Sequence, residues 1–267
     1  METKHAMSPL TRFLFIATML IGTFTMSISQ SSLSTAYPTL MTYFGVSADT
    51  IQWLTTGFMI VMCITMPISP WLLNNMSFKR LFALVLILFD FGTLIIYLGN
   101  NFPIVMFGRV MEAAAVGVLF PSYQTVLLEI TPEKKRGTIM GVAGLVMGSA
   151  LACGPIISGI VLHYTTWRGL FVFFMTVITL ILIVSFFVMK DVMARKETKL
   201  DWLSIFYTLG LVGLLYFISE IGRGNANYTE LGIILVVSLV MLTLFVYRQL
   251  HIKNPLLDLW VMKSFNY

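Results

Sequence analysis

Eight long apolar runs, almost free of charged residues, make up most of this sequence. Each run holds about twenty residues, enough for a helix to cross roughly 30 Å of hydrocarbon at about 1.5 Å per residue. A transmembrane barrel would show short segments of alternating polarity instead. The runs predict an all-α polytopic membrane protein with eight transmembrane helices, at residues 13–35, 50–73, 80–99, 103–129, 137–162, 169–189, 202–220 and 231–249.

The composition excludes a water-soluble globule. Of the 267 residues, 58% are hydrophobic and 11% are charged, whereas about 25% are charged in a typical soluble domain. Mean hydropathy is +0.88. The net charge of +5 arises from residues in short loops, where lysine and arginine set membrane topology. We therefore expect the lipid bilayer, and no nucleic acid, as a partner.

The sequence carries no pattern typical of an enzyme or a cofactor site. It contains no nucleophile triad, phosphate-binding loop or metal-ligand spacing. Its two cysteines, Cys63 and Cys153, lie within apolar runs, and its three histidines are scattered. Neither a disulfide framework nor a metal site is indicated. We expect neither enzymatic activity nor a cofactor.

Lysine and arginine are distributed unevenly between the two sides of the predicted helices. One side carries only Arg168 and Arg223. Because cytoplasmic loops carry the excess of basic residues, the other side, with the N-terminus, is expected in the cytoplasm. The protein would then span the cell (cytoplasmic or inner) membrane. The basic side comprises Lys4, Arg12, Lys79, Arg80, Lys134, Lys135, Arg136, Lys190, Arg195, Lys196, Lys199, Arg248, Lys253 and Lys263.

The longest loop on the basic side follows the sixth run, from Lys190 to Asp201. It is the natural boundary between a six-helix bundle and the remaining two runs. The predicted units are an N-terminal six-helix bundle (1–190), a cytoplasmic linker (191–200), an extra transmembrane hairpin (201–250) and a polar-to-amphipathic segment (251–267).

Three ionisable residues lie deep within predicted helices: Asp90, Arg109 and Glu112. Arg109 and Glu112 are three residues apart, so they share a helix face and can touch. Intramembrane charges are costly and mark functional sites, here for proton coupling or substrate binding; the alternative is a structural ion pair. Asp90 has no basic residue within helical reach. It is either a second functional carboxyl or a neutral, hydrogen-bonded one.

The first run ends in an unusually polar stretch around Ser29 and Gln30. Its hydroxyl and amide groups either line a water-filled cavity or bond to neighbouring helices, where small residues favour close packing. The stretch comprises Ser27, Ser29, Gln30, Ser31, Ser32 and Ser34.

Glycine and proline interrupt the fifth run. Proline removes a backbone hydrogen bond and kinks a helix, and glycine allows a neighbouring helix to approach closely. The pattern indicates either a pliable helix in a moving protein or tight packing alone. The residues are Gly144, Gly148, Gly154, Pro155 and Gly159.

These motifs resemble the major facilitator superfamily, and within it the fourteen-helix drug:proton antiporters. The fifth-run glycines with Pro155, followed by Trp167-Arg168, resemble the antiporter motif, and the stretch from Arg109 to Ala113 resembles the fourth-helix motif. Further matches are Gln52-Trp53, Pro67 and Asn254-Pro255-Leu256-Leu257-Asp258.

The chain departs from this family at three places. Ser29 stands where the family has a first-helix Asp, and Glu112 stands where it has Gln. In the loop between the second and third helices, Asn74 and Asn75 replace Asp and Arg, and only the basic pair Lys79-Arg80 remains. The resemblance therefore implies that proton coupling has moved to Glu112, with Arg109 and Asp90 as further candidates.

The resemblance implies a proton-coupled efflux transporter for drugs or other amphiphilic small molecules. It further implies about six more helices after Tyr267, so the sequence would be the N-terminal part of a transporter whose missing second half is needed for activity. Two alternatives remain open: a non-transporting fragment or membrane assembly partner, and a metabolite facilitator of the same fold.

Overall fold

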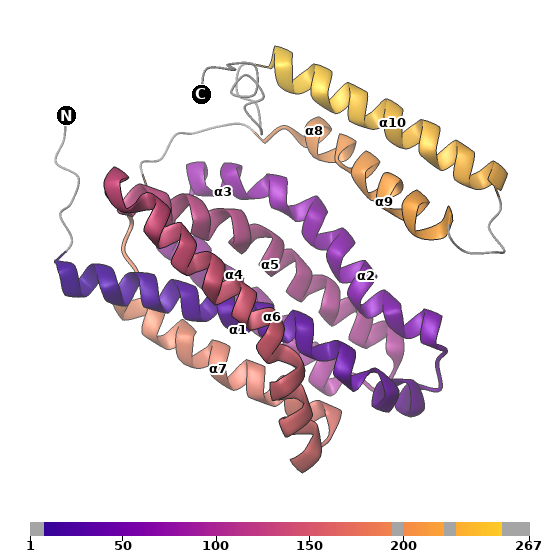
Figure 1. Ribbon diagram of the computed structural model, residues 1–267, viewed down its shortest axis with the longest axis horizontal. Coiled ribbons are helices and arrows are strands. Elements are labelled where there is room, and N and C mark those ends of the chain that lie inside the picture. The colour runs from indigo at the N-terminus through magenta and orange to yellow at the C-terminus, as the bar shows by residue number, and fades with distance from the viewer. Residues whose placement is uncertain (1–7, 194–199, 222–227, 253–267) are drawn as a thin grey trace.

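The computed structural model describes residues 8–193, 200–221 and 228–252, and these residues fold into helices joined by short loops (Figure 1). In chain order the elements are α1 (Pro9–Phe44), α2 (Ala48–Thr65), the 3₁₀ helix η1 (Met66–Ile68), α3 (Ser69–Asn75), α4 (Phe78–Leu98), α5 (Phe102–Ile130), η2 (Glu133–Lys135), α6 (Arg136–Tyr164), α7 (Trp167–Val188), α8 (Trp202–Tyr207), α9 (Leu209–Ile221) and α10 (Tyr228–His251).

The all-α membrane architecture is confirmed. Among the described residues, 7 helical segments are long and apolar enough to cross a membrane, and Trp202–Ile218 forms a shorter apolar helix at the seventh predicted run. That run is divided into α8 and α9 at Thr208 rather than continuous. Residues 194–199 of the expected linker, residues 222–227 and residues 253–267 of the last expected segment lie outside the described part.

Proline breaks one predicted helix but not another. The second predicted helix is divided into α2, η1 and α3 around Pro67 and Pro70, since proline offers no N–H to the preceding turn. The first continues through Pro38 and ends at Gly45, whose φ of 63° is the left-handed conformation that glycine adopts readily. The helix is therefore longer at both ends than the apolar run predicted.

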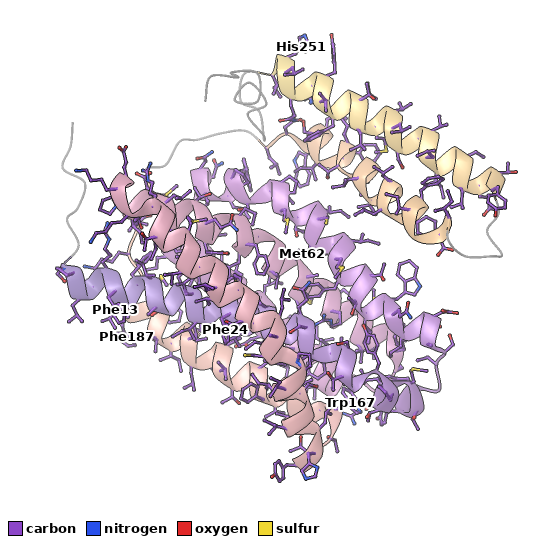
Figure 2. The ribbon with its side chains drawn as sticks, viewed as in Figure 1. Phe13, Phe24, Met62, Trp167, Phe187 and His251 are labelled. Atoms are coloured by element: carbon purple, nitrogen blue, oxygen red, sulfur yellow. The ribbon has the colours of Figure 1, made fainter. Side chains whose placement is uncertain are left out.

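The helices form a bundle of α1 to α7 with a separate hairpin beside it. α1 packs against α6 and α7, α4 against α5 and α7, and α2 against α5. α8, α9 and α10 form a layer along one side, and α9 contacts α2 (Figure 1). Large apolar side chains cover the outside: Phe13 is 67% exposed and Phe187 is 83% exposed, and both project from the bundle (Figure 2). Such a surface suits contact with lipid.

Polar contacts fasten the helix ends. At the end where α1 begins, which we call the basic end, Lys79 Nζ donates to Phe186 O at 2.7 Å and so ties the start of α4 to the end of α7. Arg80, Lys134, Lys135 and Arg136 lie at the same end, because they also start α4 or join α5 to α6.

The hairpin has its own polar clasp. Arg248 of α10 donates to both carboxylate oxygens of Asp201, the N-cap residue of α8. Its Nη2 lies 2.9 Å from Oδ1, and its Nε lies 2.9 Å from Oδ2 and 3.2 Å from Oδ1. Burial raises the pKa of Asp201, but the hydrogen bonds from Arg248 and Ser204 outweigh burial and hold it below its usual value. Asp201 is therefore ionised at neutral pH and joins the two arms of the hairpin.

Candidate functional site

The candidate site lies where the backbones of α4 and α5 are in contact at two glycines. A Cβ added at Gly92 would lie 2.8 Å from Gly108 O, and one added at Gly108 would lie 2.6 Å from Gly92 O. The two backbones are thus in direct contact, and any side chain at either position would push the helices apart. This contact positions the charged residues of α5 against α4.

Arg109 and Glu112 form an ion pair in the bundle interior. Both residues are 0% exposed, and Arg109 Nη1 donates to Glu112 Oε2 at 2.6 Å. The other carboxylate oxygen, Oε1, accepts from Thr93 Oγ1 of α4 at 2.7 Å. The spacing in the sequence anticipated the contact between Arg109 and Glu112. Thr93 was not anticipated, because it comes from another helix.

The guanidinium of Arg109 reaches across to α2. Its Nε donates to Leu54 O at 3.5 Å, and its central carbon lies 4.3 Å from the centroid of the Phe58 ring. A cation above a ring face is stabilised electrostatically. Nη2 is buried without a hydrogen-bond partner among the described residues, and so is Ser29 Oγ on α1. Arg109 thus links α5 to α2, and the N–H groups of its Nη2 have no acceptor among the described residues.

Thr93 can serve either protonation state of Glu112. Its Oγ1 lies 2.7 Å from Glu112 Oε1 and 2.9 Å from Phe89 O. A hydroxyl has one proton to donate and lone pairs to accept with. Thr93 can donate to an ionised Glu112, or accept from a protonated Glu112 while donating to Phe89 O. Arginine stays charged, so Glu112 is the member of the pair that can exchange a proton.

Asp90 lies apart from this pair. Its Oδ2 accepts from Thr179 Oγ1 of α7 at 2.8 Å, and its Oδ1 is buried without a partner among the described residues. Of the three ionisable residues identified from the sequence, the structure brings two together in the α4–α5 interface and places the third at the α4–α7 seam.

The polar stretch of α1 packs against α6. Ser27 Oγ donates to Met147 Sδ at 3.5 Å, and Ser31 Oγ donates to Ala150 O at 3.4 Å. Ser29 is buried, whereas Gln30 is half-buried. Of the two interpretations of this stretch, contacts between helices account for Ser27 and Ser31.

The glycines of α6 do not share one environment. A Cβ at Gly154 would lie 1.8 Å from Ser31 Oγ and 3.0 Å from Ser32 N, so this glycine permits the close approach of α1. Apart from the adjacent residues and backbone of α6 itself, no described atom lies within 4 Å of a Cβ built at Gly144, Gly148 or Gly159. α6 runs without interruption through Pro155.

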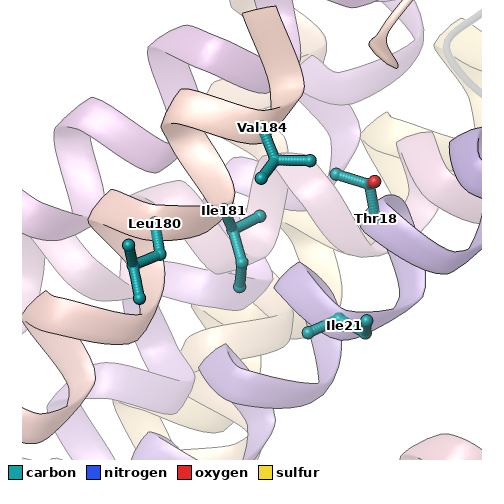
Figure 3. Close-up of a pocket in the computed structure, with 5 residues that line it drawn as sticks. All are labelled: Thr18, Ile21, Leu180, Ile181 and Val184. Carbon is teal, nitrogen blue, oxygen red and sulfur yellow. The ribbon is translucent and has the colours of Figure 1, made fainter. Parts of the chain in front are cut away.

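A second polar centre, which the sequence marked only by a Trp-Arg pair, lies at the end opposite the basic end. Arg168 donates to Tyr97 O and Gly99 O, both at 3.0 Å, and to Asn100 Oδ1 at 3.1 Å. It also donates to Tyr43 OH at 3.0 Å, so it joins α7 to the ends of α4 and α1. The apolar depression between α1 and α7, by contrast, is lined by Thr18, Ile21, Leu180, Ile181 and Val184 and holds no ionisable group (Figure 3).

The sequence matches known proteins along nearly its whole length. Residues 19–262 match the Major Facilitator Superfamily. The chain is 35% identical over 259 residues to the uncharacterized MFS-type transporter YcnB of Bacillus subtilis, covering 97% of this chain and 55% of that protein. It is 36% identical over 249 residues to the lincomycin resistance protein LmrB of Listeria monocytogenes, covering 93% and 53%. The chain thus spans about half the length of these relatives.

The fold is similar to that of solved transporters. The crystal structure of the peptide transporter POT, an E310Q mutant in complex with sulfate, superposes with a TM-score of 0.64 at 12% identity. The superposition covers 90% of this chain and 52% of that one. At this identity the likeness concerns the fold alone.

Proposed function

Because the chain belongs to the major facilitator superfamily, we propose that it is the N-terminal part of a proton-coupled transporter that exports drugs or other amphiphilic small molecules. The observation that carries the proposal is the fully buried Arg109–Glu112 ion pair, whose carboxylate also accepts from Thr93. Glu112 is the proposed proton carrier, Arg109 its charge partner, and Asp90 a further candidate.

Proton exchange at Glu112 would change the electrostatics of the bundle interior. With Glu112 ionised, the pair is neutral overall and can remain away from water. When Glu112 takes up a proton, Arg109 is left as an uncompensated buried charge, which is strongly unfavourable. The protonated state would therefore favour a conformation in which Arg109 gains water or a new partner. Such a preference couples proton uptake to a change in which side of the membrane the binding site faces.

The other parts of the proposal have separate supports. The similarity to the lincomycin resistance protein LmrB supports a drug as the substrate. The coverage of about half of each relative supports a C-terminal half that is required for activity. The excess of lysine and arginine at the basic end supports a cytoplasmic N-terminus in the cell membrane.

The test is Glu112→Gln in the complete transporter, reconstituted in vesicles with an imposed pH gradient. Glutamine keeps the shape and a hydrogen bond to Arg109 but cannot titrate, so we expect substrate binding to persist and gradient-driven efflux to be lost. Glu129→Gln, an exposed acid at the end of the same helix, is the matched control and should transport normally. Efflux by the Glu112 variant that remained fully driven by the gradient would reject Glu112 as the essential carrier and make Asp90→Asn the next variant.

A further inference from the structure

Asp90 lies near the middle of α4 and faces Thr179 near the middle of α7. The apolar side chains around this seam are open to the outside of the bundle: Ile87 is 46% exposed, Phe91 52% and Ile183 51%. In a membrane these surfaces contact hydrocarbon. The carboxyl of Asp90 therefore lies at mid-membrane depth, at the edge of the bundle rather than in its centre.

The contacts of Asp90 favour a neutral acid, because its one hydrogen bond comes from Thr179 and no described group donates to its other oxygen. An ionised carboxylate only accepts hydrogen bonds, and it does so at both oxygens. Oδ2 accepts from Thr179, but Oδ1 is buried with no donor among the described residues. An ionised oxygen left without a donor at this depth is costly. With the proton on Oδ1, the carbonyl oxygen Oδ2 accepts from Thr179 and no charge is buried.

No cation faces Asp90 from the described helices that pack against α4. α4 itself carries Lys79, Arg80 and Tyr97 towards its ends. α3 carries no ionisable group, and α7 carries Arg168, which is held at the opposite end. The ionisable groups of α5 are Arg109, Glu112, Tyr123 and Glu129, of which Arg109 pairs with Glu112. Among the described residues, Thr179 is therefore the one group that favours an ionised Asp90, and it carries no charge.

We propose that Asp90 is a second proton-binding carboxyl, which holds its proton at neutral pH at the α4–α7 seam and releases it in response to Glu112. Asp90 and Thr93 are one turn apart on α4, and Thr93 bonds Glu112. Once Glu112 is protonated, the positive charge of Arg109 is no longer balanced and favours an ionised Asp90. Uptake at one carboxyl therefore promotes release at the other. That Asp90 is neutral does not depend on the proposed transport function. The exchange of protons with Glu112 does rest on that function.

The neutral state is tested by infrared spectroscopy of the purified chain in lipid, because a protonated carboxyl has a C=O stretching band that a carboxylate lacks. At neutral pH we expect Asp90→Asn to lose one such band relative to the parent. Asp49→Asn, which removes an exposed acid of α2, should leave the bands of protonated carboxyls unchanged. Thr179→Val should keep the band and shift it to higher frequency, since the C=O loses its donor. Identical parent and Asp90→Asn spectra, or a Thr179→Val spectrum without a shift, would overturn the proposal.

The link to Glu112 is tested in the same experiment. Glu112→Gln fixes the neutral form of residue 112, so we expect the Asp90 band to disappear at lower pH than in the parent. An unchanged titration would reject the exchange while leaving the neutral state standing. If transport by the complete protein proves independent of protons, the band assigned to Asp90 is still expected, so the two proposals fail separately.

Discussion

At the scale of single residues, the hydroxyl of Thr93 is the part of the site that belongs to neither charged partner. It comes from α4 and lies 2.7 Å from Glu112 Oε1. The ion pair would otherwise leave that oxygen buried without a donor, because Arg109 Nη1 bonds the other oxygen. Thr93 thus connects Glu112 of α5 to α4, so a change of charge at Glu112 alters a hydrogen bond between the two helices.

We predict that Thr93→Val destabilises the protein although it preserves the shape of the side chain. A buried acceptor that loses its donor costs about 1–3 kcal/mol. Thermal unfolding of the purified protein in detergent measures the effect, and Thr93→Ser, which restores a hydroxyl, is the control. A valine variant as stable as the parent and as the serine variant would show that Glu112 does not depend on this hydrogen bond.

At the scale of helices, the packing of α1 against α6 depends on one glycine among several. Gly154 meets Ser31 and Ser32 of α1, whereas Gly148 on the same helix has open space where a side chain would be. A glycine pattern read from sequence cannot make this distinction, because it does not show which turn of α6 faces α1. All of these glycines look alike in the sequence, but only Gly154 among Gly144, Gly148, Gly154 and Gly159 lies against another helix.

We predict that Gly154→Leu disrupts the bundle and that Gly148→Leu does not. Inserting a side chain into a close-packed interface typically costs about 1–3 kcal/mol, and here the first added atom already clashes with Ser31 Oγ. Monodispersity in size-exclusion chromatography and the midpoint of thermal unfolding are the measurements. Equal behaviour of the two leucine variants would contradict the packing assigned to Gly154.

At the scale of the whole molecule, most of the helices could be predicted from apolar runs, because a membrane-spanning helix must be long and nearly free of charge. The contact between Arg109 and Glu112 was also predictable, since both lie on one helix. The partners supplied by other helices were not: Thr93 for Glu112, Phe58 for Arg109 and Thr179 for Asp90 depend on how α2, α4, α5 and α7 are placed in space. Nor did the apolar runs indicate the break at Thr208.

The last prediction concerns how the molecule is oriented in the membrane. In a background with Cys63 and Cys153 replaced by serine, single cysteines at Lys134, at the basic end, and at Asp49 and Tyr228, at the opposite end, occupy exposed positions. Because basic loops stay in the cytoplasm, a membrane-impermeant maleimide should label the cysteines at Asp49 and Tyr228 in intact cells. It should label the one at Lys134 only after permeabilisation. Labelling of the Lys134 variant alone in intact cells would invert the topology, and unequal labelling of the Asp49 and Tyr228 variants would place the hairpin in the opposite sense to the bundle.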